Sequence, residues 1–131
     1  MTSESMVTMH IGEVAARTEL SLRSLRHWEE VGLLTPSGRT EGGFRLYTED
    51  DVEKILVIRR MKPLGFSLDE MKAVMADLAV LRSATSDSSD REAARAHLGE
   101  IHADAHERRA RLARQLDMAD EFISLLEGQT R

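Results

Sequence analysis

The sequence contains no cysteine, only two prolines and one tryptophan. Because cysteine is absent, neither a disulfide nor a thiolate metal site can form. The apolar runs are short, and none reaches the roughly 18 residues that a membrane-spanning helix requires. Residues 1–10 are polar and lack the apolar segment of a secretory signal. These absences favour a protein of the cytoplasm with no membrane partner.

Length and charge narrow the class of protein further. A chain of 131 residues has room for about one domain, which leaves little space for a separate catalytic or ligand-binding domain. The net charge is −5, and between Arg17 and Lys62 nine basic residues are offset by eight acidic ones (9 − 8 = +1). Charge alone is therefore weak support for nucleic-acid binding. The sequence also lacks a nucleophile elbow, a phosphate-binding loop and a metalloprotease helix, so we do not expect an enzyme.

Capping motifs mark three helix starts. A Ser or Thr at the N-cap accepts a hydrogen bond from the third backbone N–H, and an acidic residue three positions later bonds back to the N-cap. The three pairs are Thr48 with Asp51, Ser67 with Glu70, and Ser89 with Glu92. Apolar residues at helical spacing follow each pair, which predicts three amphipathic helices.

Two shorter helices are predicted near the N-terminus. The first contains Ile11 and Val14 and ends near Thr18, and the second is capped by Ser21 and stops at Gly32. Two short helices joined by a turn of about three or four residues have the spacing of a helix-turn-helix. Because a small helical bundle can show the same spacing, this pattern alone is weak.

A β-hairpin is predicted for residues 36–47. Turn-forming residues come first, and an alternating strand with aromatic and basic side chains follows. The turn residues are Ser37, Gly38, Gly42 and Gly43, and the strand is Phe44-Arg45-Leu46-Tyr47. A hairpin of this kind beside a helix-turn-helix is a wing.

The C-terminal part of the sequence predicts one long helix at 90–127. Apolar residues recur in it at alternating steps of four and three, the spacing of a coiled-coil seam. So long a helix has too little core of its own to cover this stripe, so we expect a second copy of the chain as its partner. The predicted dimerisation residues are Leu98, Ile101, Ala105, Leu112, Ala119, Phe122 and Leu126. The remaining predicted boundaries are a flexible N-terminus at 1–8, a first domain at 9–81, a linker at 82–89 and a tail at 128–131.

Five motifs over residues 9–80 together resemble the MerR family of transcriptional regulators in order and spacing. They are Ile11-Gly12-Glu13-Val14-Ala15, Leu25-Arg26-His27-Trp28-Glu29, Gly32-Leu33-Leu34-Thr35-Pro36, Arg39 with Gly43-Phe44-Arg45-Leu46-Tyr47, and Leu64-Gly65-Phe66-Ser67-Leu68. The resemblance implies a mostly α fold, with an N-terminal winged helix-turn-helix, a small β-hairpin wing and a long C-terminal helix that forms an antiparallel coiled-coil dimer.

The resemblance also implies a function. Family members bind double-stranded promoter DNA as homodimers, at a near-palindromic operator in an overlong promoter spacer. They distort this spacer so that RNA polymerase engages both promoter elements, which makes deformation of the DNA part of recognition. We therefore expect a sequence-specific activator or repressor. Two alternatives are an architectural DNA-bending protein without an effector and a coiled-coil adaptor that has lost DNA binding.

The family's DNA-facing positions map onto nine residues of this sequence. On the second helix they are Ser21, Arg23, Arg26 and His27; in the wing, Arg39, Phe44, Arg45 and Tyr47; and between two later helices, Lys62. We expect Arg23 to reach a base edge and the other cations to hold phosphates. Alternatively, Arg26 pairs with Glu29 or Glu30, and Phe44 and Tyr47 pack the hairpin onto the helices. The ring of Trp28 is expected to anchor its helix in the core.

The sequence differs from the family pattern at two positions, and it lacks the cysteines of the family's metal-sensing branch. Glu19 stands at a turn position where glycine is usual, and His27-Trp28 replaces a pair of Tyr or Phe. The metal-sensing branch uses cysteines, and His102 and His106 lack a third ligand, so we expect neither a metal nor a cofactor. A small apolar effector could bind beside Met71, Met75 and Leu78, although packing explains these side chains equally well.

Overall fold

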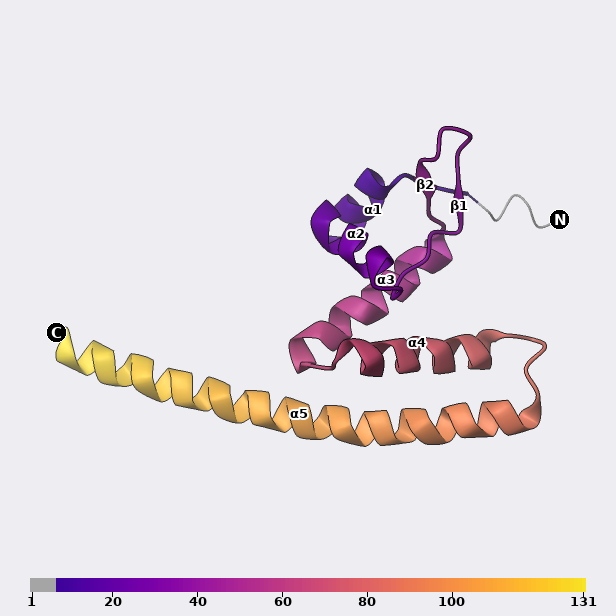
Figure 1. Ribbon diagram of the computed structural model, residues 1–131. Coiled ribbons are helices and arrows are strands. Elements are labelled where there is room, and N and C mark those ends of the chain that lie inside the picture. Colours follow the sequence, from indigo (N-terminus) through magenta and orange to yellow (C-terminus); the bar gives the residue numbers. More distant parts are fainter. Residues whose placement is uncertain (1–6) are drawn as a thin grey trace. The chain divides into compact units, whose positions relative to one another are not determined.

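The computed structural model describes residues 7–131 (Figure 1). The chain divides into two compact units, Met1–Ala76 and Asp77–Arg131. Its secondary structure is mostly helical, with one two-stranded antiparallel sheet. The predicted flexible N-terminus at 1–8 lies outside the described residues, except for Val7 and Thr8.

The first unit begins with the predicted helix-turn-helix. Helix α1 spans Ile11–Thr18 and helix α2 spans Leu22–Glu30. The Ser21 hydroxyl accepts a hydrogen bond from the Ser24 backbone N–H at 3.0 Å, which confirms the predicted N-cap. Trp28 is buried, as expected for an anchor of α2 in the core. The cap and the core anchor of α2 are therefore the residues that the sequence predicted.

The turn between α1 and α2 places a glutamate in the left-handed region. Glu19 has φ 58° and ψ 36°, and it is the only non-glycine residue with positive φ in the part of the chain that the structure describes. Its successor Leu20 donates a backbone hydrogen bond to the Ala15 carbonyl at 3.2 Å, which closes the turn at the end of α1. Glu19 thus adopts the glycine conformation without being glycine.

Glu19→Gly is expected to stabilise the protein by about 0.5–1 kcal/mol. A left-handed backbone costs an L-residue roughly 1–2 kcal/mol, and the added freedom of glycine in the unfolded chain offsets about half of that gain. The lost ion pair with Arg59, 3.8 Å apart and with Glu19 86% exposed, contributes little. Urea unfolding would measure the change. Glu19→Ala is the control, because it removes the carboxylate and keeps Cβ; equal midpoints for the two variants would contradict the prediction.

The wing is a short antiparallel hairpin. Strand β1 spans Gly38–Arg39 and strand β2 spans Arg45–Leu46, with Gly38 opposite Leu46 and Arg39 opposite Arg45. The hairpin predicted from residues 36–47 is confirmed. Tyr47 and Met9 exchange two backbone hydrogen bonds of 2.8 and 2.9 Å, an extra pairing that the sequence did not indicate.

Three further helical segments follow the wing. Helix α3 spans Glu49–Met61, the 3-10 helix η2 spans Lys62–Leu64, and helix α4 spans Leu68–Arg82. Both predicted capping boxes are present at the starts of α3 and α4: Thr48 with Asp51, and Ser67 with Glu70. The buried apolar residues of the first unit include Val14, Leu25, Trp28, Leu34, Tyr47, Val52, Ile55 and Ile58.

Helix α5 spans Ser88–Gln129 and is the main element of the second unit. The predicted N-cap Ser89 is wrong, because the carboxylate of Asp87 accepts the capping hydrogen bond from the Asp90 N–H at 2.8 Å. Arg91 then ties α5 to the preceding turn by donating to the carbonyl oxygens of Leu81, at 3.1 Å, and Ser83. Among residues 7–131, no helix is long and apolar enough to cross a membrane.

Burial along α5 separates two halves of the predicted seam. Ala94 is buried, and Leu98, Ile101 and Ala105 are half-buried within the single chain. From residue 109 onward every residue of α5 is exposed. The expectation that a single chain leaves the apolar stripe of α5 exposed therefore holds only for the C-terminal half of this helix.

Candidate nucleic-acid interface

Helix α2 exposes basic side chains along one face. Arg23, Arg26 and His27 are all exposed, because the buried face of the helix is formed by Leu25 and Trp28. Within residues 7–131, neither Arg23 nor Arg26 forms an ion pair, so the alternative of Arg26 paired with an acid of its own helix is wrong in this structure. These cations are free to contact an anionic surface.

Glu29 connects α2 to both strands of the wing. Its carboxylate accepts a hydrogen bond from Arg39 at 3.0 Å and another from the Nε of Arg45. Arg39 also donates to the Gly43 carbonyl at 3.0 Å, across the base of the hairpin turn. The two wing arginines that the sequence assigned to DNA are therefore already paired with an acid.

The two aromatic residues of the wing have opposite environments. Phe44 is 68% exposed at the hairpin turn, with only an edge-on contact to the His10 ring, so the packing alternative does not apply to it. Tyr47 is fully buried, so its assignment as a DNA contact is wrong: its side chain belongs to the core. Burial raises the pKa of the Tyr47 phenol, and its hydroxyl has no hydrogen-bond partner in the described part of the chain.

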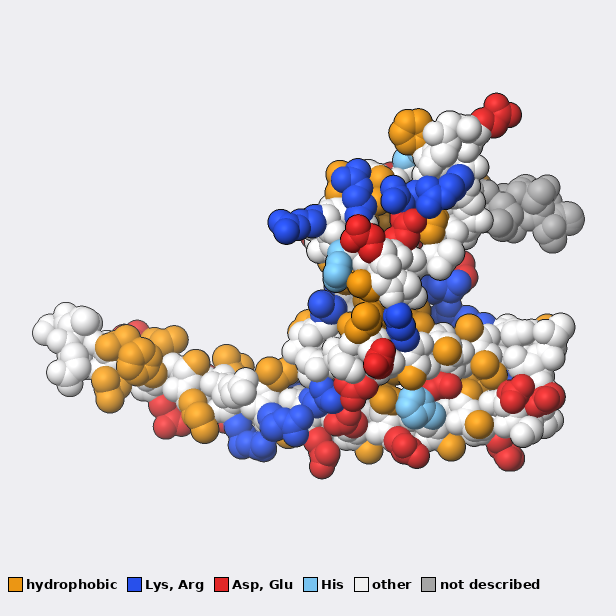
Figure 2. Space-filling model, in the orientation of Figure 1, with side chains coloured by type: hydrophobic (Ala, Val, Ile, Leu, Met, Phe, Trp, Pro, Cys, Tyr) orange, Lys and Arg blue, Asp and Glu red, His pale blue; other side chains and the backbone are white. Residues whose placement is uncertain are grey.

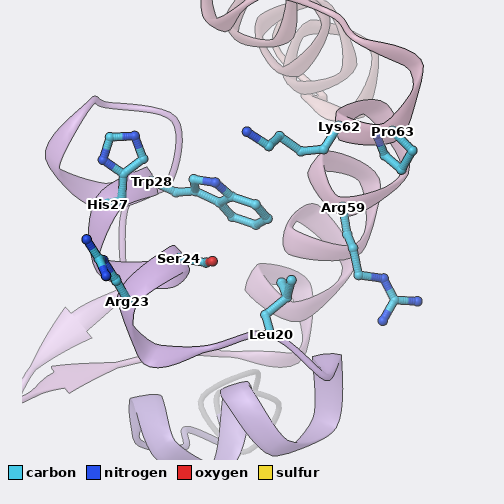
Figure 3. A pocket seen from close by; sticks show the side chains of 8 residues that line it. All are labelled: Leu20, Arg23, Ser24, His27, Trp28, Arg59, Lys62 and Pro63. Carbon is cyan, nitrogen blue, oxygen red and sulfur yellow. The ribbon is translucent and has the colours of Figure 1, made fainter.

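A pocket of about 360 Å³ lies between α2 and the end of α3 (Figure 3). Its apolar lining comes from Leu20, Trp28 and Pro63, and its basic lining from Arg23, His27, Arg59 and Lys62, with Ser24 between them. Lys62 extends toward the indole of Trp28, whereas the guanidinium of Arg59 points away from it. The Arg59 guanidinium also donates to the carbonyl of Thr18, at the end of α1, at 2.5 Å. The pocket combines an apolar surface with basic side chains from three elements, α2, α3 and η2.

Sequence reasoning missed two residues of this region, Glu29 as a partner of the wing and Arg59 as part of the pocket. Glu29 was considered only as a partner for Arg26 on its own helix. Its actual partners lie 10 and 16 residues further along the chain. The sequence signal that could have identified Glu29 is an acidic residue at the end of the second helix, followed by a hairpin that carries two arginines. Figure 2 shows basic and acidic side chains gathered together over this part of the first unit.

The three histidines of α5 have different contacts. His102 and His106 contact each other edge-on, with ring centroids 4.7 Å apart, and His97 instead contacts the Asp77 carboxylate. Within residues 7–131, no group of three or more potential metal ligands is present.

Two family models match the chain. The model described as MerR HTH family regulatory protein matches residues 9–78, and the model described as MerR, DNA binding matches residues 52–125. The transcriptional regulator CueR of Vibrio cholerae is 45% identical over 67 residues, which make up 51% of this chain and 48% of that protein. The chain thus covers about half the length of this curated relative.

Solved structures agree with this assignment. A MerR-family regulator from Listeria monocytogenes is 27% identical, with 88% of this chain and 83% of that chain covered and a TM-score of 0.66. HiNmlR, a MerR-family regulator that lacks the sensor domain and was solved on promoter DNA, shares the fold at 23% identity, with coverage of 90% and 89% and a TM-score of 0.68. Because one family model alone spans more than half of the chain, the protein belongs to the MerR family of helix-turn-helix regulatory proteins, which are regulators and not enzymes.

Proposed function

We propose that this protein is a transcriptional regulator that binds a near-palindromic promoter operator as a homodimer. The observation that carries the proposal is the row of Arg23, Arg26 and His27, which are exposed on the second helix of a helix-turn-helix and form no ion pair within residues 7–131. The wing lies beside this helix and is linked to it through Glu29. In this motif the second helix enters the major groove. Work at a promoter also implies a location in the cytoplasm and contact with RNA polymerase.

The proposed DNA-contacting side chains fall into two groups, those that contact base edges and those that contact the sugar–phosphate backbone. Arg23 is our choice for a base contact, since a guanidinium can bond both major-groove acceptors of guanine. Arg26 and His27 would contact phosphates. Ser21 would cap α2 and contact the DNA backbone at the start of this helix. The wing residues Arg39, Phe44 and Arg45 would contact the sugar–phosphate backbone. Lys62 of η2 would contact it as well.

The pocket beside Trp28 fits one sugar–phosphate unit. A deoxyribose has an apolar face that can lie against Leu20 and Pro63, and its phosphate can pair with the Lys62 ammonium. Because Trp28 is the only tryptophan of the chain and lines this pocket, a change in tryptophan fluorescence on addition of DNA can be assigned to this residue.

Lys62→Ala is expected to weaken binding to specific and nonspecific DNA alike. Each phosphate contact releases condensed counterions, so the slope of log K against log salt should fall by about 0.9 for each lost contact, which is about 1.8 for a dimer that loses two. Binding measured by Trp28 fluorescence at several salt concentrations would give this slope. Lys54→Ala is the matched control, because Lys54 pairs with Asp50 at 3.4 Å on α3 and does not line the pocket. An unchanged slope for Lys62→Ala would remove Lys62 from the interface.

The exposed half of α5 supports the dimer. Its exposed apolar residues include Leu112, Leu116, Met118, Phe122, Ile123, Leu125 and Leu126, and Figure 2 shows hydrophobic side chains clustered along this end of the helix. At about 100° per residue they cover an arc of roughly 180°, wider than a two-stranded seam needs. So large an apolar surface on a soluble helix marks an interface.

Charge order along the same half favours an antiparallel pair. Arg109, Arg111 and Arg114 come first, and the acidic residues Asp117, Asp120, Glu121 and Glu127 follow. Two parallel helices in register would place like charges side by side, which costs free energy, whereas antiparallel helices avoid this. We therefore propose an antiparallel coiled-coil dimer in which Leu112, Ala119, Phe122 and Leu126 carry most of the contact, with the half-buried Leu98, Ile101 and Ala105 contributing less.

Selection of bound fragments from random genomic DNA tests the DNA-binding proposal. The purified protein should enrich a small set of fragments that share one sequence motif. A recovered pool with the composition of the input would contradict the proposal.

A further inference from the structure

Glu29 is the acid of α2 that faces the wing, and its side chain is more buried than those of the two wing arginines that it binds. Its side chain is 16% exposed, compared with 49% for Arg39 and 33% for Arg45. Its two carboxylate oxygens are used separately, one for each arginine. A two-residue strand pair has few backbone hydrogen bonds of its own, so these side-chain contacts are a large share of what fixes the angle between wing and helix.

Electrostatics alone predicts that Glu29 harms DNA binding. A carboxylate near the phosphate backbone repels it, and here it also neutralises part of the charge of two cations expected to meet DNA. If that were the whole effect, removing the charge of Glu29 would tighten binding to any DNA.

We propose that Glu29 is a positioning residue that holds Arg39 and Arg45 at a fixed distance from α2, so that helix and wing meet the DNA as one rigid unit. This inference rests on the proposed DNA-binding function. The Nε of Arg45 and one terminal nitrogen of Arg39 are bound to Glu29, which leaves other guanidinium N–H groups for phosphates. Positioning matters for a specific operator, where helix and wing must fit simultaneously, and much less for nonspecific DNA, where each cation finds a phosphate independently.

Glu29→Gln therefore has opposite effects on the two kinds of DNA. The amide keeps the shape of the side chain and removes the charge that holds the arginines. Affinity for the operator recovered by genomic selection should fall about tenfold, a typical coupling for residues in one ion-pair network. Affinity for random duplex should stay equal or rise by up to about threefold. Glu30→Gln is the matched control, because it removes the same charge from the next, exposed position, which has no partner among residues 7–131. It should leave the ratio of specific to nonspecific affinity unchanged.

The effect should also depend on the arginines. In a background that carries both Arg39→Ala and Arg45→Ala, Glu29→Gln should no longer change the ratio of specific to nonspecific affinity, because Glu29 has lost both of its partners. Circular dichroism at the assay temperature would verify that every variant is folded. If Glu29→Gln tightens operator and random DNA equally, or if its effect persists without the arginines, the positioning role is wrong even though the protein binds DNA. If the wild type selects no operator, the proposed function fails instead.

Discussion

Phe122→Asp is expected to convert the protein from a dimer to a monomer. Phe122 is 61% exposed in the single chain, so the substitution leaves the fold of the protomer intact. In the proposed dimer, the new carboxylate would be buried without a partner, which costs several kcal/mol. Because a monomer engages only one half-site, affinity for the operator should fall about 100-fold or more. Light scattering would measure the mass, and a binding titration would measure the affinity.

Ser124→Asp is the matched control for this prediction. Ser124 is exposed on the same helix, about 200° around its axis from Phe122 and outside the apolar arc. This variant carries the same added charge and should remain dimeric. Leu112→Asp, ten residues earlier on the apolar arc, should behave like Phe122→Asp. If both arc variants keep the mass of a dimer, the coiled-coil proposal is wrong.

Asp51→Ala is expected to destabilise the first unit by about 2–4 kcal/mol. Asp51 is 2% exposed, and its carboxylate accepts hydrogen bonds from the Thr48 N–H at 2.9 Å and from the Ser37 hydroxyl at 2.6 Å. Alanine removes one half of a capping box and leaves two donors without this acceptor. The side chain also joins the base of the wing to α3, so loss of this contact should loosen the hairpin. Urea unfolding gives the free energy, and amide hydrogen exchange in residues 37–47 reports on the hairpin.

Glu53→Ala controls for the loss of an acid from α3. Glu53 is exposed two residues after Asp51 and should change the unfolding free energy by no more than about 0.5 kcal/mol. Should Asp51→Ala be as mild as Glu53→Ala, the buried carboxylate would not be the link between wing and helix that its contacts indicate.

Features set by local chemistry were predictable from the sequence. The caps at Ser21, Thr48 and Ser67 depend on residues within one helical turn, and the structure confirms each of them. The cap of α5 was misplaced because Ser86-Asp87-Ser88-Ser89 contains several competing N-caps in a row. The capping-box pattern selected Ser89, whereas the structure uses the carboxylate of Asp87.

Features set by contacts distant in sequence were not predictable in the same way. The DNA contact of Tyr47 is an expectation carried over from the family's wing positions. In the structure the backbone of Tyr47 pairs with Met9, 38 residues earlier in the chain, and its ring is buried, which the local pattern does not indicate. The wing contacts of Glu29 depend on where the hairpin folds back onto α2. The apolar repeat of α5 predicts a stripe along the helix, but it does not distinguish Ala94, which is buried within the chain itself, from the residues after 109, which are exposed.

The central claim is that a symmetric dimer of this protein recognises a promoter operator, and hydroxyl-radical footprinting of the selected genomic fragments tests it most directly. We predict two protected half-sites related by a dyad, inside the spacer between two promoter elements, with enhanced cleavage at the centre where the DNA is distorted. A single, asymmetric protected patch, or uniform weak protection along every fragment, would contradict the dimeric regulator.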